Sequence, residues 1–152
     1  MIVSDLEKKF KHRLDLRVRD AEVYLGGVVH NSTYLDYLEH GRNTYLREHN
    51  LDFEVLYRTR DIKFTQASGS QVYKKALKSN DTFYVLTRVE RASTLQFRYV
   101  QSIVKSPENE VCMEAITMGV LIGAKGMPIR VPEDIDVIMT SLGAGRDMII
   151  PG

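Results

Sequence analysis

The chain has 152 residues, of which 43% are hydrophobic and 27% charged, and these values fit one ordinary globular domain. The formal net charge is only +1 and no long run of one sign occurs, which argues against a nucleic-acid partner. No apolar run approaches the ~20 residues needed to span a bilayer, and residues 1–13 lack the apolar centre of a signal peptide. We therefore expect a cytoplasmic protein without a membrane span.

Cys112 is the only cysteine, which excludes an internal disulfide and a cysteine-based zinc site within one chain. Residues 110–122 have the composition of a buried strand, so the thiol is expected to be a small core side chain, with a catalytic thiol as the alternative. The four histidines are scattered without regular spacing, so no metal site is predicted. Nothing in the sequence indicates a cofactor.

The first predicted strand covers residues 13–20, where polar and apolar side chains alternate. Its apolar face carries Leu14, Leu16 and Val18. A bend is expected before the glycine pair at 26–27, ahead of the next element.

The clearest helix in the sequence follows this bend. Asn31 or Ser32 suits its N-terminal cap, and residues 49–50 suit its end. The apolar positions recur at i, i+3, i+4, i+7 and i+11 and comprise Tyr34, Tyr37, Leu38, Gly41 and Tyr45. The side chains expected to face water are Asp36, His40, Asn43 and Arg47. Because a helix glycine costs about 1 kcal/mol relative to alanine, Gly41 indicates that a sheet passes close to the backbone there.

The remaining residues are rich in predicted strands. Residues 60–68 alternate, and residues 83–90, 94–104 and 111–123 form three long segments separated by the turn-like residues 91–93 and 106–110. Pro132 and the acids that follow it predict a short C-terminal helix within 130–142, before an irregular tail. The order of elements predicts an α+β fold, with one long helix packed on an antiparallel sheet of about five strands. Because such a sheet leaves an edge unpaired, a homo-oligomer is expected.

The helix and the residues before it carry a recognisable motif. Gly27, Val28 and Val29 are followed by Asn31, Tyr34, Tyr37, Glu39 and Arg42, and this spacing resembles the signature of hotdog-fold thioesterases. The most similar grouping is the 4-hydroxybenzoyl-CoA thioesterase branch, with its bacterial acyl-CoA and plant acyl-lipid relatives. Residues 73–85 and 125–135 resemble two further segments of the family in the right order, so the likeness runs from about Leu14 to Ile135.

This resemblance implies one hotdog domain over residues 1–152, with a core at about 12–142 and irregular ends. The long central helix would be wrapped by a curled antiparallel sheet, and dimers would often pair into homotetramers. The resemblance also implies active sites at the dimer interface near the helix N-terminus. The reaction implied is hydrolysis of an acyl thioester carried on coenzyme A or on acyl carrier protein.

The chain departs from the family at Tyr24. Many relatives have an aspartate three residues before the glycine that matches Gly27, and that aspartate is the nucleophile or general base. A tyrosine has an ordinary pKa near 10 and is a weak base at neutral pH, although it can donate a hydrogen bond or line an acyl pocket. Glu22 lies on the same face as Tyr24 if the strand stays regular, and Asp20 continues that alternation. A bulge at the glycines would bring Glu22 inward.

Glu39 is the other candidate carboxylate. It lies about 140° from Tyr34 around the helix, on a flank that can meet a partner subunit. Partial burial there would raise its pKa toward the range of a general base. The alternative is a solvated Glu39 that pairs with Arg42 or Asn43 along the helix, which contributes only a few tenths of a kcal/mol.

Thioester hydrolysis also needs donors for the developing oxyanion. The free backbone N–H groups of a helix N-terminus suit this task, so the candidates are the backbone from Gly27 to Asn31 and the Asn31 amide. The alternative role of Asn31 is a plain cap. His30 is a candidate general base, or a surface or interface histidine. The rings of Tyr34 and Tyr37 are expected in the core or along the acyl tunnel.

The phosphates of coenzyme A would meet surface cations. Arg88 and Arg91 are the candidates by analogy of position, with Lys74 and Lys75 less favoured, and ordinary solvated charges are the alternative. The leading functional prediction is an acyl-CoA or acyl-carrier-protein thioester hydrolase. The alternatives are a hotdog protein that binds an acyl-CoA or metabolite without turnover, and a hotdog dehydratase, whose D-x-N-x-x-H motif is absent here.

Overall fold

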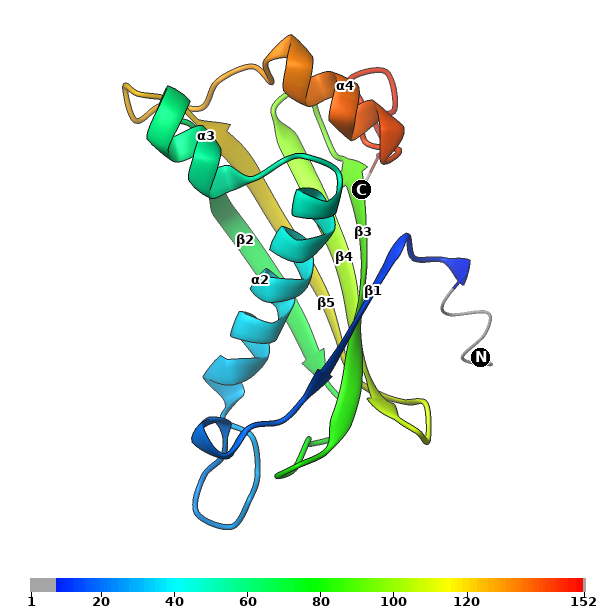
Figure 1. Cartoon of the computed structure of the whole chain (residues 1–152). Coiled ribbons are helices and arrows are strands. Elements are labelled where there is room, and N and C mark those ends of the chain that lie inside the picture. The colour runs from blue at the N-terminus through cyan, green and yellow to red at the C-terminus, as the bar shows by residue number, and fades with distance from the viewer. Residues whose placement is uncertain (1–7, 152) are drawn as a thin grey trace. The chain divides into compact units, whose positions relative to one another are not determined.

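The computed structural model describes residues 8–151 (Figure 1). Residues 1–7 and Gly152 lie outside the described residues. The prediction that residues 1–13 are not a signal peptide therefore falls partly outside them. The elements in chain order are β1 (His12–Arg17), the 3₁₀ turn η1 (Asp20–Glu22), α2 (Asn31–Glu48), α3 (Phe53–Arg60), β2 (Lys63–Tyr73), β3 (Thr82–Arg91), β4 (Gln96–Ser106), β5 (Glu110–Ile122) and α4 (Glu133–Ser141).

Within the described residues, the five strands form one sheet in the order β1-β3-β4-β5-β2. Strand β1 pairs antiparallel with β3, in a register that places Leu14 opposite Val85 and Leu16 opposite Phe83. The two edges of the sheet are therefore β1 and β2. The sheet thus has unpaired edges, as the sequence predicted for a sheet of about five strands. Strand β1 ends at Arg17, three residues before the end of the predicted strand.

The chain divides into two compact units, and several elements run from one unit into the other. The first unit comprises the residues up to Thr44, together with Gln71–Arg88 and Gln101–Ala115. The second unit comprises Tyr45–Ser70, Val89–Val100 and the residues from Ile116 onward. The single hotdog domain over residues 1–152 stays a prediction.

The core of the first unit lies between the first three turns of α2 and strands β3, β4 and β5. The Tyr37 ring packs on Phe83, with ring centroids 4.6 Å apart. A Cβ atom added to Gly41 would come within 2.7 Å of a Val85 methyl carbon, so the sheet passes close to the helix there as predicted. The other buried members of this core include Val18, Val29, Tyr34, Leu38, Leu77, Val85, Ile103, Cys112, Met113 and Ala115. Burial raises the pKa of the Cys112 thiol to about 11, which fits the expected core role.

The core of the second unit gathers the last turn of α2, helices α3 and α4, and the ends of three strands. Its buried side chains include Tyr45, Leu46, Leu51, Leu56, Ile62, Val89, Phe97, Tyr99, Leu121, Ile135 and Met139. The predicted C-terminal helix is α4. Helix α3 was not predicted, and local capping explains it: the Asp52 carboxylate accepts from the Glu54 N–H at 2.9 Å, and Asp61 ends the helix in the left-handed conformation at φ 53°.

Candidate active site at the start of helix α2

A tight loop in the first unit links η1 to α2 and protrudes beyond the helix N-terminus (Figure 1). Val23 and Val29 form an antiparallel bridge at its base. Above the bridge, the Tyr24 N–H donates to the Val28 carbonyl and the Gly27 N–H donates to the Tyr24 carbonyl, both at 2.8 Å. The second of these bonds closes a turn in which Gly27 has φ 83°, a conformation that favours glycine.

Glu22 sits beneath this loop with its side chain only 12% exposed. Its carboxylate accepts hydrogen bonds from the Arg19 N–H at 2.8 Å, from the Arg19 guanidinium at 3.0 Å and from the Tyr37 hydroxyl at 2.9 Å. Its backbone carbonyl accepts from the His30 N–H at 3.1 Å. Because η1 replaces the regular strand expected here, the alternation that placed Asp20, Glu22 and Tyr24 on one face does not apply. We expected a bulge at the glycines to bring the Glu22 side chain inward. The 3₁₀ turn η1 does this instead.

The protonation of Glu22 follows from these contacts. Burial raises the pKa of Glu22, but the hydrogen bonds from Arg19 and Tyr37 outweigh it and lower the pKa below its ordinary value. A carboxylate with a lowered pKa and three donors is a weak base. Glu22 is therefore better suited to hold the loop on α2 than to accept a proton from water.

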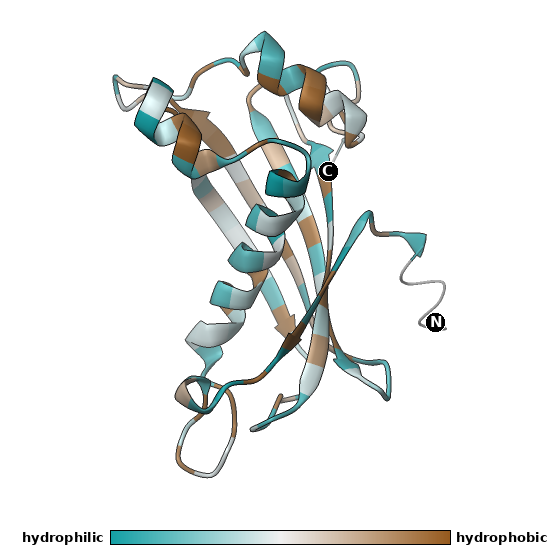
Figure 2. Ribbon diagram, in the orientation of Figure 1, coloured by the Kyte–Doolittle hydropathy of each residue, from teal (hydrophilic) through white to brown (hydrophobic). Residues whose placement is uncertain are grey.

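Tyr24 and His30 face each other across the loop. Their ring centroids lie 3.6 Å apart at an angle of 55°, and the Tyr24 side chain is half exposed. The tyrosine at the family's aspartate position thus contacts the candidate histidine. The loop tip beside it is apolar and exposed, with Leu25 fully accessible and Val28 38% exposed (Figure 2).

Helix α2 begins at Asn31, so neither Asn31 nor Ser32 is the N-cap. The residue before the helix is His30, whose carbonyl accepts from the Thr33 N–H at 3.0 Å. Three of the candidate oxyanion donors are occupied, because the N–H groups of Gly27, Val29 and His30 donate to backbone carbonyls. Two remain: in residues 8–151, the N–H groups of Val28 and Asn31 have no acceptor, and neither has the N–H group of Ser32, which was not among the candidates. These are the donors that a ligand can use.

Glu39 projects from the exposed side of α2. No ion pair or hydrogen bond joins it to Arg42 or Asn43 within the described part of the chain. Arg42 instead donates to the Gln101 amide oxygen at 3.1 Å, and the Gln101 amide nitrogen donates to the Leu38 carbonyl at 2.9 Å. Glu39 is therefore exposed in this chain, as the solvated alternative has it, and its role in catalysis stays a prediction.

Tyr34 lies buried in the first turn of α2, and its hydroxyl oxygen accepts from the Leu77 N–H at 2.8 Å. Burial raises the pKa of its phenol. The ring lines an open cavity of about 250 Å³ together with Tyr73, Lys74, Lys75 and Ala76. Tyr73 and Ala76 were not among the predicted site residues, although they lie in the family-like segment 73–85.

Arg88, in the first unit, is partly buried. Its guanidinium lies 5.3 Å from the centre of the Phe10 ring and donates to the Lys9 carbonyl at 3.5 Å. It is therefore not the ordinary solvated charge of the alternative, and its contact with coenzyme A stays a prediction. Lys74 and Lys75 each pair with a carboxylate of β5, Glu114 at 3.3 Å and Glu110 at 2.8 Å respectively.

Arg91, in the second unit, is not the surface cation that was expected. It is 2% exposed, and its guanidinium donates to the Ser93 carbonyl at 2.8 Å, the Thr94 carbonyl at 2.7 Å, the Ala144 carbonyl at 3.3 Å and the Asp136 carboxylate at 3.1 Å. Four of its five N–H donors are thereby used, and its burial keeps the guanidinium away from a phosphate at the surface. Arg91 is a structural residue, and the prediction that it binds coenzyme A is corrected.

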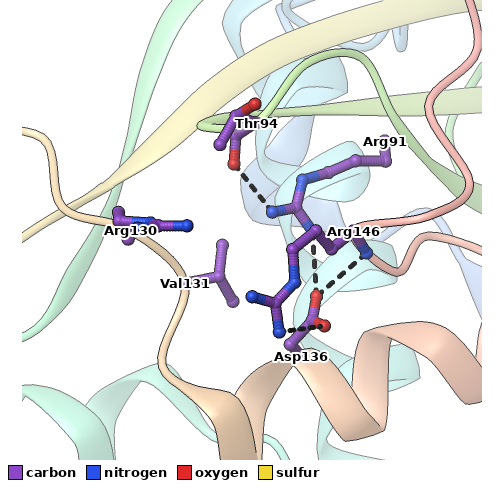
Figure 3. Close-up of a pocket in the computed structure, with 6 residues that line it drawn as sticks. All are labelled: Arg91, Thr94, Arg130, Val131, Asp136 and Arg146. Atoms are coloured by element: carbon purple, nitrogen blue, oxygen red, sulfur yellow. Dashed lines mark hydrogen bonds and ion pairs between the residues drawn. The ribbon is translucent and has the colours of Figure 1, made fainter.

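Figure 3 shows that Asp136 contacts two arginines in this unit, Arg91 and Arg146. The Arg91 guanidinium donates to its carboxylate at 3.1 Å, and Arg146 meets the same carboxylate with its guanidinium at 3.5 Å and with its backbone N–H at 3.1 Å. The cavity beside them, lined also by Arg130 and Val131, has a volume of about 10 Å³. That is about the space of one water molecule, so the cluster is a buried ion-pair network and not a ligand pocket.

Within residues 8–151, no group of three or more His, Cys, Asp or Glu side chains could hold a metal ion. No helix in the same residues is both long and apolar enough to cross a bilayer. The cytoplasmic location stays a prediction.

Comparison with known proteins defines the class of protein. Residues 15–138 match the Thioesterase-like superfamily, and this is more than half of the chain. The chain belongs to this superfamily. It is similar to a chloroplastic acyl-acyl carrier protein thioesterase of Arabidopsis thaliana, with 29% identity over 124 residues, which cover 82% of this chain. They cover 65% of that relative, so the chain spans slightly less than two thirds of its length.

Solved structures share the fold. A 1,4-dihydroxy-2-naphthoyl-CoA thioesterase from Synechocystis superimposes with a TM-score of 0.79 at 17% identity, over 86% of this chain and 96% of that chain. A DHNA-CoA thioesterase from Staphylococcus aureus gives a TM-score of 0.77 at 21% identity, over 85% and 88% of the two chains. The predicted α+β hotdog fold of the thioesterase type is confirmed.

Proposed function

We propose that the chain hydrolyses an acyl thioester carried on coenzyme A or on acyl carrier protein, at the N-terminus of α2. The observation that carries the proposal is the set of N–H groups on Val28, Asn31 and Ser32, which have no acceptor in residues 8–151 and lie at the positive end of the helix dipole. Membership of the Thioesterase-like superfamily supports the reaction class.

In the proposed mechanism, a water oxygen attacks the thioester carbonyl carbon while a carboxylate takes one proton from that water. The carbonyl oxygen becomes an oxyanion and accepts hydrogen bonds from the free N–H groups; one such donor contributes roughly 3 to 4 kcal/mol. The tetrahedral intermediate then collapses, the C–S bond breaks, and the thiolate takes up the proton. The products are a carboxylic acid and a free thiol.

Glu39 is our proposed general base, because Glu22 is held by Arg19 and Tyr37. Glu39 is eight residues beyond Asn31, a rise of roughly 12 Å along one helix. That separation is too large for both to act on the same carbonyl group within one chain. The proposal therefore requires two copies, in which Glu39 of one copy acts at the helix N-terminus of the other. A homodimer is the smallest such assembly, and a homotetramer contains two of them.

The test is thiol release from acyl-CoA and acyl-carrier-protein substrates by wild type and Glu39→Gln. We expect the variant to lose about a hundredfold or more in kcat, the range of a general base. Asp36→Asn is the matched control, because Asp36 is another exposed carboxylate on α2. Mixing Glu39→Gln chains with chains that carry a blocked helix terminus, Asn31→Pro, should restore activity through the hybrid dimer. Equal activity of wild type and Glu39→Gln would exclude Glu39 as the base.

A second candidate function is binding of an acyl-CoA without turnover. It is favoured by Tyr24, which stands at the family's aspartate position and packs against His30 at 3.6 Å. The same assay separates the two functions. Retained acyl-CoA affinity with no thiol release above background would select the binding protein.

A further inference from the structure

The cavity at Tyr34 lies in the first unit, between the first turn of α2 and the chain that leaves β2. The Tyr34 and Tyr73 rings meet edge to face, with centroids 5.5 Å apart at 81°. Tyr34 is buried whereas Tyr73 is 47% exposed, so the two rings form one wall that runs from the interior to the surface. Lys74, Lys75 and Ala76 complete the lining of this cavity of about 250 Å³.

Backbone hydrogen bonds attach this wall to the candidate active site. The Leu77 N–H donates to the Tyr34 hydroxyl at 2.8 Å, and the Leu77 carbonyl accepts from the Val29 N–H at 3.0 Å. Two residues further on, the Ser79 N–H donates to the Gly27 carbonyl at 2.6 Å. Residues 77–79 are therefore bonded to the loop that precedes α2, and the cavity wall at 73–76 directly precedes them. The cavity lies next to the helix N-terminus.

The two lysines do not make the cavity cationic. The N–H groups of Lys74 and Lys75 both donate to the Cys112 carbonyl, at 2.8 and 3.2 Å, so two residues stand opposite one residue of β5, as in a bulge. Their ammonium groups pair with Glu114 and Glu110. Because the charged ends are held at these carboxylates, the parts left to face the cavity are the aliphatic stems.

We propose that this cavity receives the acyl group of the substrate, and that it selects an uncharged aryl or medium-length acyl group. The inference rests on the proposed thioester hydrolysis, which puts the carbonyl at the start of α2. The walls are aromatic rings and methylene stems, and edge-on ring contacts favour an aryl guest. An enclosed apolar cavity of about 150 Å³ holds one benzene molecule. The cavity here, of about 250 Å³, is open to solvent, so it can cover a benzoyl or octanoyl group but leaves most of a palmitoyl chain in water. Tyr73 and Ala76 are thus specificity-determining residues.

The experiment compares kcat/KM for butanoyl-, octanoyl-, palmitoyl-, benzoyl- and succinyl-CoA in wild type, Ala76→Leu and Tyr73→Ala. In wild type, benzoyl and octanoyl should exceed palmitoyl and succinyl by roughly tenfold or more, the discrimination expected of an apolar pocket. Ala76→Leu adds bulk to the wall, and should lower the benzoyl and octanoyl values by a similar factor while butanoyl stays within about twofold. Tyr73→Ala should raise palmitoyl relative to octanoyl. Ala124→Leu, at an exposed turn in the second unit, is the matched control.

A loss in Ala76→Leu that is equal for all five substrates overturns the proposal while leaving thioester hydrolysis intact. If wild type releases no thiol from any substrate, calorimetric binding decides the role of the cavity separately. Tighter binding of benzoyl-CoA than of free coenzyme A, lost in Ala76→Leu, supports the proposal. Equal binding of benzoyl-CoA and free coenzyme A by wild type, or a preference that Ala76→Leu keeps, overturns it.

Discussion

The Tyr37 hydroxyl donates a 2.9 Å hydrogen bond to the Glu22 carboxylate and thereby joins the turn before the loop to the second turn of α2. Burial raises the pKa of Tyr37, and its bond to Glu22 raises it further, so the phenol remains a donor at every physiological pH. This contact fastens the loop that carries Tyr24 and the free N–H group of Val28.

Removing this hydroxyl tests its contribution. Tyr37→Phe should lower the free energy of unfolding by roughly 1.5 to 3 kcal/mol, the range for a hydrogen bond to a charged group. Urea denaturation measures the loss. The control is Tyr57→Phe on α3, whose ring is 51% exposed, and which should stay within about 0.5 kcal/mol of wild type. Similar losses in the two variants would show that the Glu22 bond contributes nothing specific.

The lowered pKa of Glu22 predicts a pH dependence of stability. A carboxyl group whose pKa is lower in the folded than in the unfolded chain stabilises the fold fully above its unfolded value, 4.5 here. This contribution disappears as the pH falls through the folded value. The gap in unfolding free energy between wild type and Glu22→Gln should thus be constant from about pH 6 to 8 and shrink below about pH 4.5. Denaturation at a series of pH values measures it; a gap that widens on acidification would contradict the assignment.

Substitution of Arg91 distinguishes a structural role of this side chain from a role in binding the acyl-CoA. Arg91→Leu leaves Asp136 buried without its main partner, and breaking a buried pair in this way costs about 3 to 5 kcal/mol. The double variant Arg91→Leu with Asp136→Leu should recover much of that loss, because no buried charge is left unpaired by it. Thermal denaturation and KM for the acyl-CoA distinguish the roles. A raised KM with unchanged stability would return Arg91 to the substrate-binding residues.

The close approach of Gly41 to Val85 predicts that substitutions at these two positions compensate each other in stability. Gly41→Ala gains about 1 kcal/mol of helix propensity, but its new Cβ would lie 2.7 Å from the Val85 methyl carbon. Overpacking of this kind costs about 1 to 3 kcal/mol, so the single variant should be less stable than wild type. Adding Val85→Ala removes this contact and leaves only contacts of 3.2 and 3.3 Å, so Gly41→Ala should be less destabilising in that background than in wild type. Additive effects in a double-mutant cycle would rule out the contact.

The predictable parts of this chain are those in which a regular pattern extends over many residues. The 3.6-residue periodicity of Tyr34, Tyr37, Leu38 and Tyr45 predicted the buried face of α2, and each of these side chains is at most 6% exposed. Helix α3 was missed because its eight residues bury a single side chain, Leu56, and carry no comparable periodicity.

The site was less predictable because it depends on short irregular segments and on contacts distant in sequence. Glu22 was placed on a strand, yet η1 and its bond to Tyr37 determine where its carboxylate points. Arg91 was expected at the surface, since its acceptor Asp136 lies 45 residues away and only the folded chain brings them together. Tyr73 and Ala76 lie in the family-like segment 73–85, but that likeness assigned them no role, and only the cavity identifies them.

The loop before α2 is fastened at its base and free at its tip. Val23 pairs with Val29, and the Gly27 N–H closes the turn on Tyr24. Leu25, by contrast, is fully exposed, and the space around Gly26 is open to at least 4 Å. The tip is therefore an attachment point for engineering: a fluorophore coupled to a cysteine at position 25 would sit a few residues from the helix terminus without replacing a bonded group, and could report the arrival of each acyl-CoA optically.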